Sequence, residues 1–394
     1  MSFYEQYDEL LTRQELDLVA EAQAFCAGGF SAELLTSFRK GRPYSEQWIR
    51  AWAAAGFLGL QARKKHGGHE ASYLCKVRVA QTMAEHGFAA AFAINNLQNA
   101  VTKLSRSGTQ EQLDALLIPM RTGAVLSAPA MTEPAGGSDL SALTTTARPV
   151  NGGWLINGTK DWVTNGMVVG CVSLLAKVQA PDGTSEIASF LTPFGNASSV
   201  RRAEIDVPGA MSFRLGRVIF EDHFVPSWAL FNEPGQALKS SLAAINAARV
   251  HVAAMCVASL RAALREAVDY CEVRKTFGKP LLEHQGLRWE LAEVAIRLEA
   301  ANSLVFKAAR LVNEGKPSLT AAAQAKKFAV DTAIWGVDQC VRAMGAVGAT
   351  GSHRLAMLLS EVRLSAYGDG TNEILVDRIG KGLVKEYGSQ EQGV

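Results

Sequence analysis

Several short segments of the chain carry residue types that could bind a ligand or transfer a proton. The first, residues 128–140, is a Gly-rich turn that contains Met131, Thr132, Gly137 and Ser138. Small residues let a flat ring or a phosphate approach the backbone closely, and backbone N–H groups in such a turn can bind an anion. An ordinary loop has the same composition, so the segment alone leaves both interpretations open.

A second segment, residues 161–166, places Trp162 two positions before Thr164. Strand side chains repeat every two residues, so a strand would set both on one face, where they could lie against a flat ligand. A tryptophan packed in a core is the alternative interpretation.

Two further segments, residues 274–285 and 341–348, lie at the ends of predicted helices and contain cationic and small residues. An Arg fork suits a phosphate, but cations also suit the C-terminus of a helix, and small residues suit helix–helix contact. Arg342 could equally be a solvated helix residue. The candidates are Arg274, Thr276, Phe277, Gln285, Arg342 and Gly345.

A fifth segment sets Asp369 between two glycines, directly before Thr371 and Glu373. Thr371 is a suitable N-cap for a final helix, because its hydroxyl can accept a hydrogen bond from the first turn. A carboxylate in this position could act as a general base. A lone Asp beside Gly is more often a turn residue.

The elements that must position these segments change along the chain. Residues 1–122 have mostly helical periodicity, residues 123–234 contain short apolar runs typical of strands, and residues 235–394 return to helices. Long helices are expected over 238–272, 284–314 and 319–347, and Asn157-Gly158 predicts a hairpin turn. The order helices, strands, helices disfavours a Rossmann sheet.

The amino-acid composition argues against several classes of protein. The 394 residues include 48% hydrophobic and 20% charged residues with a net charge of +2, which disfavours disorder and a nucleic-acid partner. The six cysteines form no C-x-x-C pair, so neither a metal site nor a disulfide framework is indicated. The longest apolar stretch is bounded by Arg249 and Arg261, which argues against a membrane span. With an acidic N-terminus and no export signal, a cytoplasmic location is expected.

The five segments, in this order, resemble the acyl-CoA dehydrogenase family over nearly the whole chain. The family carries M-T-E-P-x-x-G-S-D, W-x-T-N-G, R-x-x-F-G-K-P and Y-E-G-T-x-E segments, and Asp369 falls where it usually has Glu. The resemblance implies an α+β multidomain fold: an N-terminal helical domain, a middle β-barrel or β-sandwich domain and a C-terminal four-helix bundle. It also implies FAD between the β domain and the bundle, and a homotetramer or at least a dimer.

The resemblance also implies roles for individual residues. Along the flavin ring and its ribityl chain it places Met131, Thr132, Gly137 and Ser138, with Trp162 and Thr164 against the ring. Toward the FAD of a neighbouring subunit it places Arg274, Thr276, Phe277, Gln285, Arg342 and Gly345. Near the phosphates of the bound FAD it places Thr371 and Glu373. In substrate binding it implies Ser138, Arg249 and Gly370.

The implied reaction is removal of an α-proton from an acyl thioester by Asp369 while the β-hydride passes to the flavin, with electron-transferring flavoprotein as oxidant. Asp shortens the catalytic arm by about 1.5 Å relative to Glu, and a 1 Å misplacement can cost about 10²-fold in rate. A branched, bulky or alicyclic acyl group would be one way to compensate. Pro129, where an aromatic is common, and Arg342, in place of Gln, also depart from the family pattern.

Three alternatives stay open at this point. The acyl group could be attached to an acyl-carrier or peptidyl-carrier protein instead of CoA. The same fold could serve a flavin monooxygenase, or a reductase running the reaction backwards. A flavin-binding scaffold without catalysis is the non-enzymatic alternative.

Overall fold

The N-terminal region is a layer of helices in which α5 is the central element. The computed structural model describes residues 3–179, 184–195 and 198–388. Every residue of α5 is buried, including two cations, Lys76 and Arg78. The helices are α1 (Glu5–Asp8), α2 (Arg13–Phe25), α3 (Ser31–Arg39), α4 (Gln47–Ala54), α5 (Tyr73–Ala84), α6 (Phe88–Asn96), α7 (Gln98–Ser107), α8 (Gln110–Gln112) and α9 (Ile118–Arg121).

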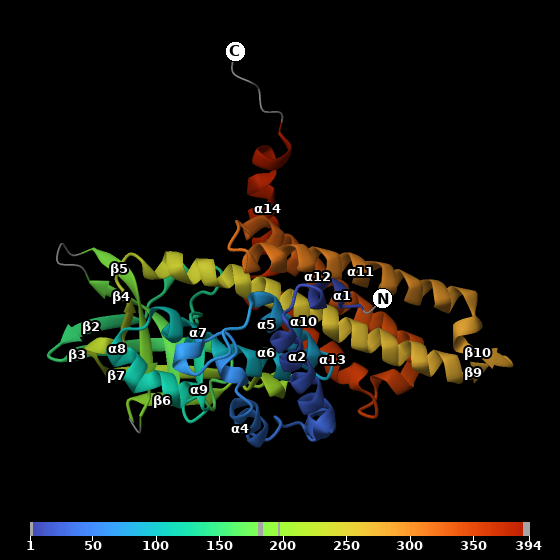
Figure 1. Ribbon diagram of the computed structural model, residues 1–394, viewed down its shortest axis with the longest axis horizontal. Helices are drawn as coiled ribbons and strands as arrows, with labels where there is room; N and C mark the ends of the chain where they lie inside the picture. Colours follow the sequence, from blue (N-terminus) through green and yellow to red (C-terminus); the bar gives the residue numbers. More distant parts are fainter. Residues whose placement is uncertain (1–2, 180–183, 196–197, 389–394) are drawn as a thin grey trace, which may run out of the picture.

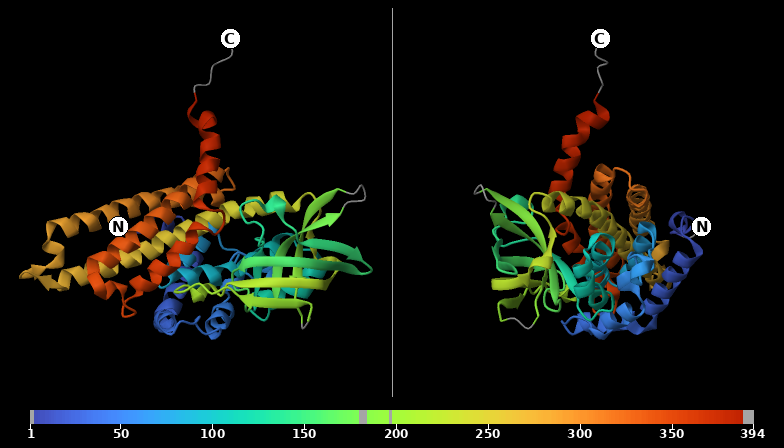
Figure 2. Two further views of the ribbon diagram at one scale, coloured as in Figure 1. Left: turned by 180° about the vertical axis from the view of Figure 1, so that it is seen from behind. Right: turned by 60° about the vertical axis from the view of Figure 1, so that its left-hand side comes forward.

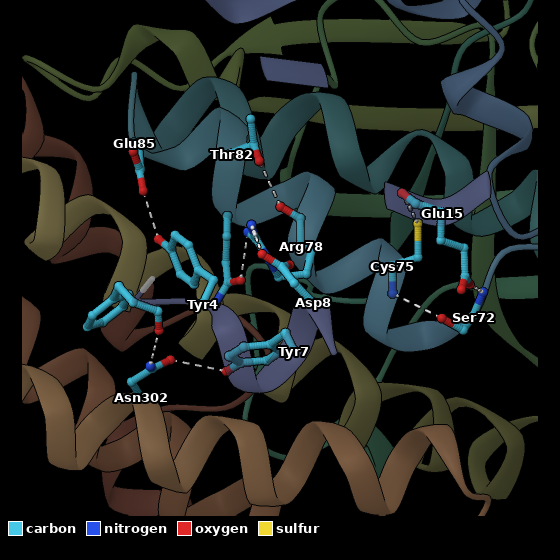
Figure 3. Close-up of polar contacts among 12 residues, drawn as sticks. Tyr4, Tyr7, Asp8, Glu15, Ser72, Cys75, Arg78, Thr82, Glu85 and Asn302 are labelled. Carbon is cyan, nitrogen blue, oxygen red and sulfur yellow. Dashed lines mark hydrogen bonds and ion pairs between the residues drawn. The ribbon is translucent and has the colours of Figure 1, made fainter. Parts of the chain in front are cut away.

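Polar contacts made by α1 fix α5 against the rest of the protein (Figure 3). The guanidinium of Arg78 donates to the carboxylate of Asp8 at 2.7 Å, which supplies a counter-ion to a buried cation. The hydroxyl of Tyr7 donates to Asn302, in the C-terminal region, at 3.2 Å. The short N-terminal helix thus ties α5 to the C-terminal helices.

The middle region forms one eight-stranded sheet. Its order is β6-β7-β3-β2-β4-β5-β8, with β1 added parallel to β4. The pairing of β4 with β1 brings the start of the first Gly-rich segment onto the sheet. The strands are β1 (Ser127–Ala130), β2 (Thr146–Val150), β3 (Gly153–Val163), β4 (Cys171–Gln179), β5 (Ser185–Pro193), β6 (Val200–Glu204), β7 (Gly216–Pro226) and β8 (Leu230–Asn232).

The predicted hairpin turn at Asn157-Gly158 is wrong. These residues lie inside β3, where its register with β7 shifts between Ile156 and Gly158. A Cβ on Gly158 would lie 2.4 Å from the hydroxyl oxygen of Thr145, so glycine is needed there for close backbone approach. The turn between β2 and β3 instead uses Gly152, whose φ is +78°.

The C-terminal region is a helical bundle, and the three predicted long helices and the final helix after Thr371 are confirmed. A small hairpin of β9 (Lys275–Thr276) and β10 (Lys279–Pro280) connects the first two helices. In Figures 1 and 2 the last helix projects away from the body of the molecule. The helices are α10 (Ala237–Val273), α11 (Gln285–Asn313), α12 (Leu319–Met344), α13 (Arg354–Val362) and α14 (Asn372–Tyr387).

Helix α10 runs along the long axis of the molecule, with the sheet at one end and the β9–β10 hairpin at the other (Figure 1). By length and composition it could cross a membrane, since one 18-residue window has a mean hydropathy of 1.4. That window is 61% buried inside the protein, as expected of the core helix of a bundle. The predicted fold class, with helical, β-rich and helical regions in that order, is confirmed.

Candidate active site

Asp369 lies in the turn between α13 and α14, and two cations hold the backbone on either side of its carboxylate. The Nε of Arg249, on α10, donates to the carbonyl of Asp369 at 3.0 Å. The Nζ of Lys326, on α12, donates to the next carbonyl, of Gly370, at 2.5 Å. Both bonds go to the backbone, so the side chain of Asp369 stays available for another partner.

The backbone of this turn is left-handed at two consecutive positions. Asp369 has φ +56° and Gly370 has φ +94°. A Cβ at Gly370 would lie 3.2 Å from the Nη2 of Arg249, so the guanidinium packs directly against the glycine. Non-glycine residues in this conformation concentrate at functional sites, where the surroundings impose it.

The electrostatic environment of Asp369 combines burial with a ring of cations. Burial raises the pKa of the Asp369 carboxyl above its usual value, while the positive charges of Lys326, Arg249 and Lys76 act in the opposite direction. Burial also lowers the pKa of Lys326 and that of Lys76, each to about 8. The result is a carboxylate with strengthened basicity that the three cations keep ionisable.

A second group of predicted residues gathers where β1 ends and β3 ends. The backbone N–H of Asp161 donates to the carbonyl of Thr132 at 2.8 Å. Next to it the Nζ of Lys160 donates to the carboxylate of Glu133 at 2.6 Å, in a fully buried ion pair. These bonds bring Met131 and Thr132 beside Trp162, although about thirty residues separate them along the chain.

Trp162 and Thr164 do not share one face, so the prediction of a common strand face is wrong. Trp162 has φ +58° and is 54% exposed, whereas Thr164 is buried beyond the end of β3. The left-handed residue breaks the two-residue alternation. The amide of Asn165 donates to the carbonyl of Ala93 on α6 at 2.8 Å and fixes the turn that follows. The exposed indole is free to stack on a flat ligand.

The remaining residues of the Gly-rich turn lie at the surface beside Trp162. Gly137 and Ser138 are exposed, and a Cβ on Gly137 would lie 3.2 Å from the methyl group of Thr132. In the turn before α14, Thr371 caps that helix, since its hydroxyl accepts from the N–H of Ile374. The backbone groups at the start of that helix can bind an anion.

A third group lies at the far tip of the bundle, remote from the sheet (Figure 1). Its two halves adjoin, because the thiol of Cys271, at the end of α10, contacts the carbonyl of Ala343, at the end of α12. Phe277 is 95% exposed and has φ +50°. The group consists of Arg274, Thr276, Phe277, Gln285, Arg342 and Gly345.

The structure therefore separates the predicted cofactor residues into two sets. Met131, Thr132 and Trp162 lie on the sheet, but the bundle-tip set lies at the other end of α10 (Figure 1). One FAD molecule bound to the sheet cannot touch both sets of one chain. An exposed, flat indole beside a glycine turn fits a flavin, and two exposed Arg side chains fit the phosphates of a second copy's FAD.

Comparison with known proteins decides the family. Residues 12–124, 128–223 and 236–384 match the N-terminal, middle and C-terminal domains of acyl-CoA dehydrogenase, respectively. The benzylmalonyl-CoA dehydrogenase of Aromatoleum aromaticum is 33% identical over 85% of this chain and 89% of its own. The chain belongs to the acyl-CoA dehydrogenase family. Membership makes it a flavin oxidoreductase and implies FAD as its cofactor.

Solved structures of the family have the same fold. The butyryl-CoA dehydrogenase of Megasphaera elsdenii superimposes with a TM-score of 0.89 at 26% identity, covering 95% of this chain and 99% of its own. A chain from a structure described as an electron transferring flavoprotein of Acidaminococcus fermentans gives 0.90, also at 26% identity, covering 95% of this chain and 99% of that one. The acyl-CoA dehydrogenase identity of the fold is thus supported along the chain.

Sequence reasoning missed three lysines that shape the site: Lys76, Lys160 and Lys326. Lys76 lies on α5 two residues before Arg78, Lys326 lies on α12 directly before Lys327, and Lys160 lies on β3 directly before Asp161. A buried lysine has to find a partner. Because each of the three has another charged residue close by in the sequence, no local pattern distinguishes it from an exposed lysine.

Proposed function

We propose that this acyl-CoA dehydrogenase forms the α,β double bond of an acyl thioester and uses Asp369 as its catalytic base. One observation carries the proposal: a half-buried carboxylate lies in a left-handed turn whose backbone two cations hold, so that the side chain of Asp369 is left available. Burial raises the pKa of the Asp369 carboxyl, and a carboxylate with a raised pKa is a stronger base.

The chain's own residues would carry out the proton transfer and orient the substrate. A carboxylate oxygen of Asp369 removes the proton from the α-carbon, and the electron pair of that C–H bond becomes the new double bond as hydride leaves the β-carbon. When bound, FAD supplies the hydride acceptor. Arg249 and Lys326 fix the position of the base through its backbone.

Proton uptake neutralises the carboxylate of Asp369, and the loss of its negative charge is balanced by the hydride that the acceptor would take up. Met131, Thr132, Gly137, Ser138 and Trp162 are proposed to hold the flavin, with Thr371 and Glu373 near its phosphates. Ser138, Arg249 and Gly370 are proposed to contact the substrate, while Thr164, which is buried, supports the flavin turn.

The substrate is proposed to be a CoA thioester with a branched, bulky or alicyclic acyl group. The shorter arm of Asp369, relative to Glu, supports a substrate whose α-carbon is presented differently from that of a straight chain. One relative is named for benzylmalonyl-CoA, and this name supports a bulky acyl group. The carrier-protein thioester stays the alternative substrate.

The partners are proposed on the same basis. Electron-transferring flavoprotein is the proposed oxidant, because the structure described under that name contains a chain with this fold. A homotetramer or dimer is proposed because the exposed bundle-tip residues are too far from the sheet of their own chain to complete its site (Figure 1). The cytoplasmic location stays a prediction from the sequence.

Anaerobic reduction of the flavin tests the proposal. We expect the visible absorption of the bound flavin to bleach with a straight, branched or alicyclic acyl-CoA, and Asp369→Asn to slow bleaching by at least ~10³-fold. This variant keeps its fold, because Arg249 and Lys326 bind backbone carbonyls and not the carboxylate.

The matched control is Asp377→Asn, which alters an exposed carboxylate on α14 that forms an ion pair with Lys381. Its bleaching rate should equal that of the wild type. If no CoA thioester bleaches protein that contains FAD, the carrier-protein, monooxygenase and scaffold alternatives take precedence. If bleaching survives in Asp369→Asn, another residue is the base.

A further inference from the structure

Lys76 is a buried cation that forms no ion pair in the part of the chain that the structure describes. Its residue is 8% exposed. Its Nζ donates to the amide oxygen of Asn99 on α7 at 3.1 Å, and no ion pair to it exists among residues 3–179, 184–195 and 198–388. An ammonium group has three donors, so two are unused.

The other two buried lysines show what is unusual about Lys76. Lys160 forms an ion pair with Glu133 at 2.6 Å, and Lys326 donates to a backbone carbonyl in the turn that carries the base. Burying an ammonium without a compensating charge is unfavourable. A cation kept in this state next to an active site is well suited to an anion that arrives with the substrate.

Lys76 lies close to the catalytic base. Its charge acts on the carboxyl of Asp369, and the negative charge of Asp369 in turn favours the protonated form of Lys76. The other groups that face it do not neutralise it: Arg106 is a further cation. Burial, with Lys76 adding to it, keeps His251 on α10 neutral by lowering its pKa well below the usual range.

Lys76 is also connected to a small cavity next to the flavin segment. Asn99, which holds Lys76, donates its amide N–H to Asn96 at 3.0 Å. Both Asn side chains line a cavity between α7 and the strands β1 and β4. The cavity is small, about 20 Å³, and most of its exposed lining is apolar, but Ser127 also lines it, and the buried hydroxyl of Ser127 has no hydrogen-bond partner among the described residues. Lys103 lines it as well.

We propose that Lys76, held in place by Asn99, binds a carboxylate at the far end of the acyl chain, so that the preferred substrates are thioesters of dicarboxylic acids. This inference rests on the proposed function. The thioester would lie with its α-carbon at Asp369 and extend past Lys76 toward the cavity that Asn96 and Asn99 line. The carboxylate would then complete the ion pair that the protein itself leaves open.

A different role for Lys76 has to be distinguished. Its charge could serve only to tune Asp369, in which case it would affect every substrate equally. Recognition of a carboxylate instead changes the preference between two substrates that differ only at the far end. The ratio of kcat/KM for the two substrates separates these roles, because a general effect on the base cancels from it.

The experiment uses the FAD-containing enzyme and pairs of acyl-CoA thioesters, about four to six carbons long, that end in either a carboxylate or a methyl group. Wild-type enzyme should prefer the carboxylated member of a pair. Lys76→Met should lower this preference about 100-fold, as expected for loss of one partner of a buried, charge-assisted contact. Lys76→Arg, which keeps the charge, should retain most of it, and Lys65→Met, at an exposed lysine, should match the wild type.

Two results would overturn the inference. In one, the wild-type enzyme oxidises the methyl-ended thioesters as well as or better than their carboxylated partners. In the other, Lys76→Met slows both members equally, which assigns Lys76 to the base and not to the substrate. Failure of the proposed function looks different, because then neither member of any pair reduces the flavin.

Discussion

Breaking the buried ion pair between Glu133 and Lys160 should be among the most destabilising single changes in the proposed flavin-binding segment. The two side chains are 1% and 0% exposed, and their charged atoms are 2.6 Å apart. Glu133 also accepts hydrogen bonds from the N–H and hydroxyl of Thr144, both at 2.6 Å, and from the N–H of Thr145 at 3.1 Å. One carboxylate therefore ties three stretches of chain together.

Glu133→Gln keeps the shape of the side chain but leaves Lys160 buried without a counter-ion. Removing one partner of a buried pair costs about 3–5 kcal/mol, and we expect a loss of at least ~3 kcal/mol in the free energy of unfolding. The double variant Glu133→Leu/Lys160→Met replaces the pair by apolar groups of similar volume. It should be more stable than Glu133→Gln, because no isolated charge remains.

The pair also predicts a pH dependence. Hydrogen bonds from Lys160 and the two threonines lower the pKa of Glu133 to about 2, against the opposing effect of burial. The folded protein therefore binds this proton less readily than the unfolded chain does. The resulting stability is fully present above the unfolded pKa of about 4.5 and is lost as the pH falls toward 2.

Urea unfolding, followed by circular dichroism and flavin fluorescence between neutral pH and about pH 3, measures both effects. Wild type should lose stability across the acidic range more steeply than Glu133→Gln, which no longer has this carboxyl. The reasoning is refuted if Glu133→Gln costs less than about 1 kcal/mol at neutral pH, or if the double variant is the less stable of the two.

Two further predictions concern the turn that carries the base. Lys326→Met removes a cation that lowers the pKa of Asp369, so the acidic limb of the rate of flavin reduction should move to higher pH; a profile that moves down or not at all contradicts the assigned role. Gly370→Ala forces a Cβ to within 3.2 Å of Arg249 at a φ of +94°, and should slow flavin reduction by about 10- to 100-fold in folded protein. Unchanged stopped-flow rates in that variant would show that the turn need not be tight.

The long helices were predictable because their signal is local. Periodic apolar residues and good helix formers mark α10, α11 and α12, and Thr371 marks the start of α14 by its capping hydroxyl. The structure at Asn157-Gly158 was not predictable, because the same dipeptide is found both in hairpin turns and in β-bulges. Contact with Thr145, which directly precedes β2, decides between them.

Only those residues of the candidate site that belong to the family's sequence motifs could be predicted. Asp369 and the flavin-facing segments follow from the family resemblance, and the structure brings Thr132 next to Asp161 as expected of one site. The orientation of Trp162 depends on a left-handed backbone that no strand pattern indicates. The partners of Lys76 and Lys326 are far from them in the sequence. Only the folded structure shows that Lys326 donates to the carbonyl of Gly370, whereas Lys76 donates to Asn99 and forms no ion pair among the described residues.

The distance between the bundle tip and the sheet has a genetic consequence in the proposed oligomer. A substitution at Arg274 or Phe277 would weaken FAD binding in the neighbouring subunit. A substitution at Trp162 or Asp369 would impair only the site of its own chain (Figure 1). Two differently damaged alleles could therefore complement each other within one mixed assembly. Natural selection on the residues of the bundle tip would thus depend on the activity of the neighbouring subunit.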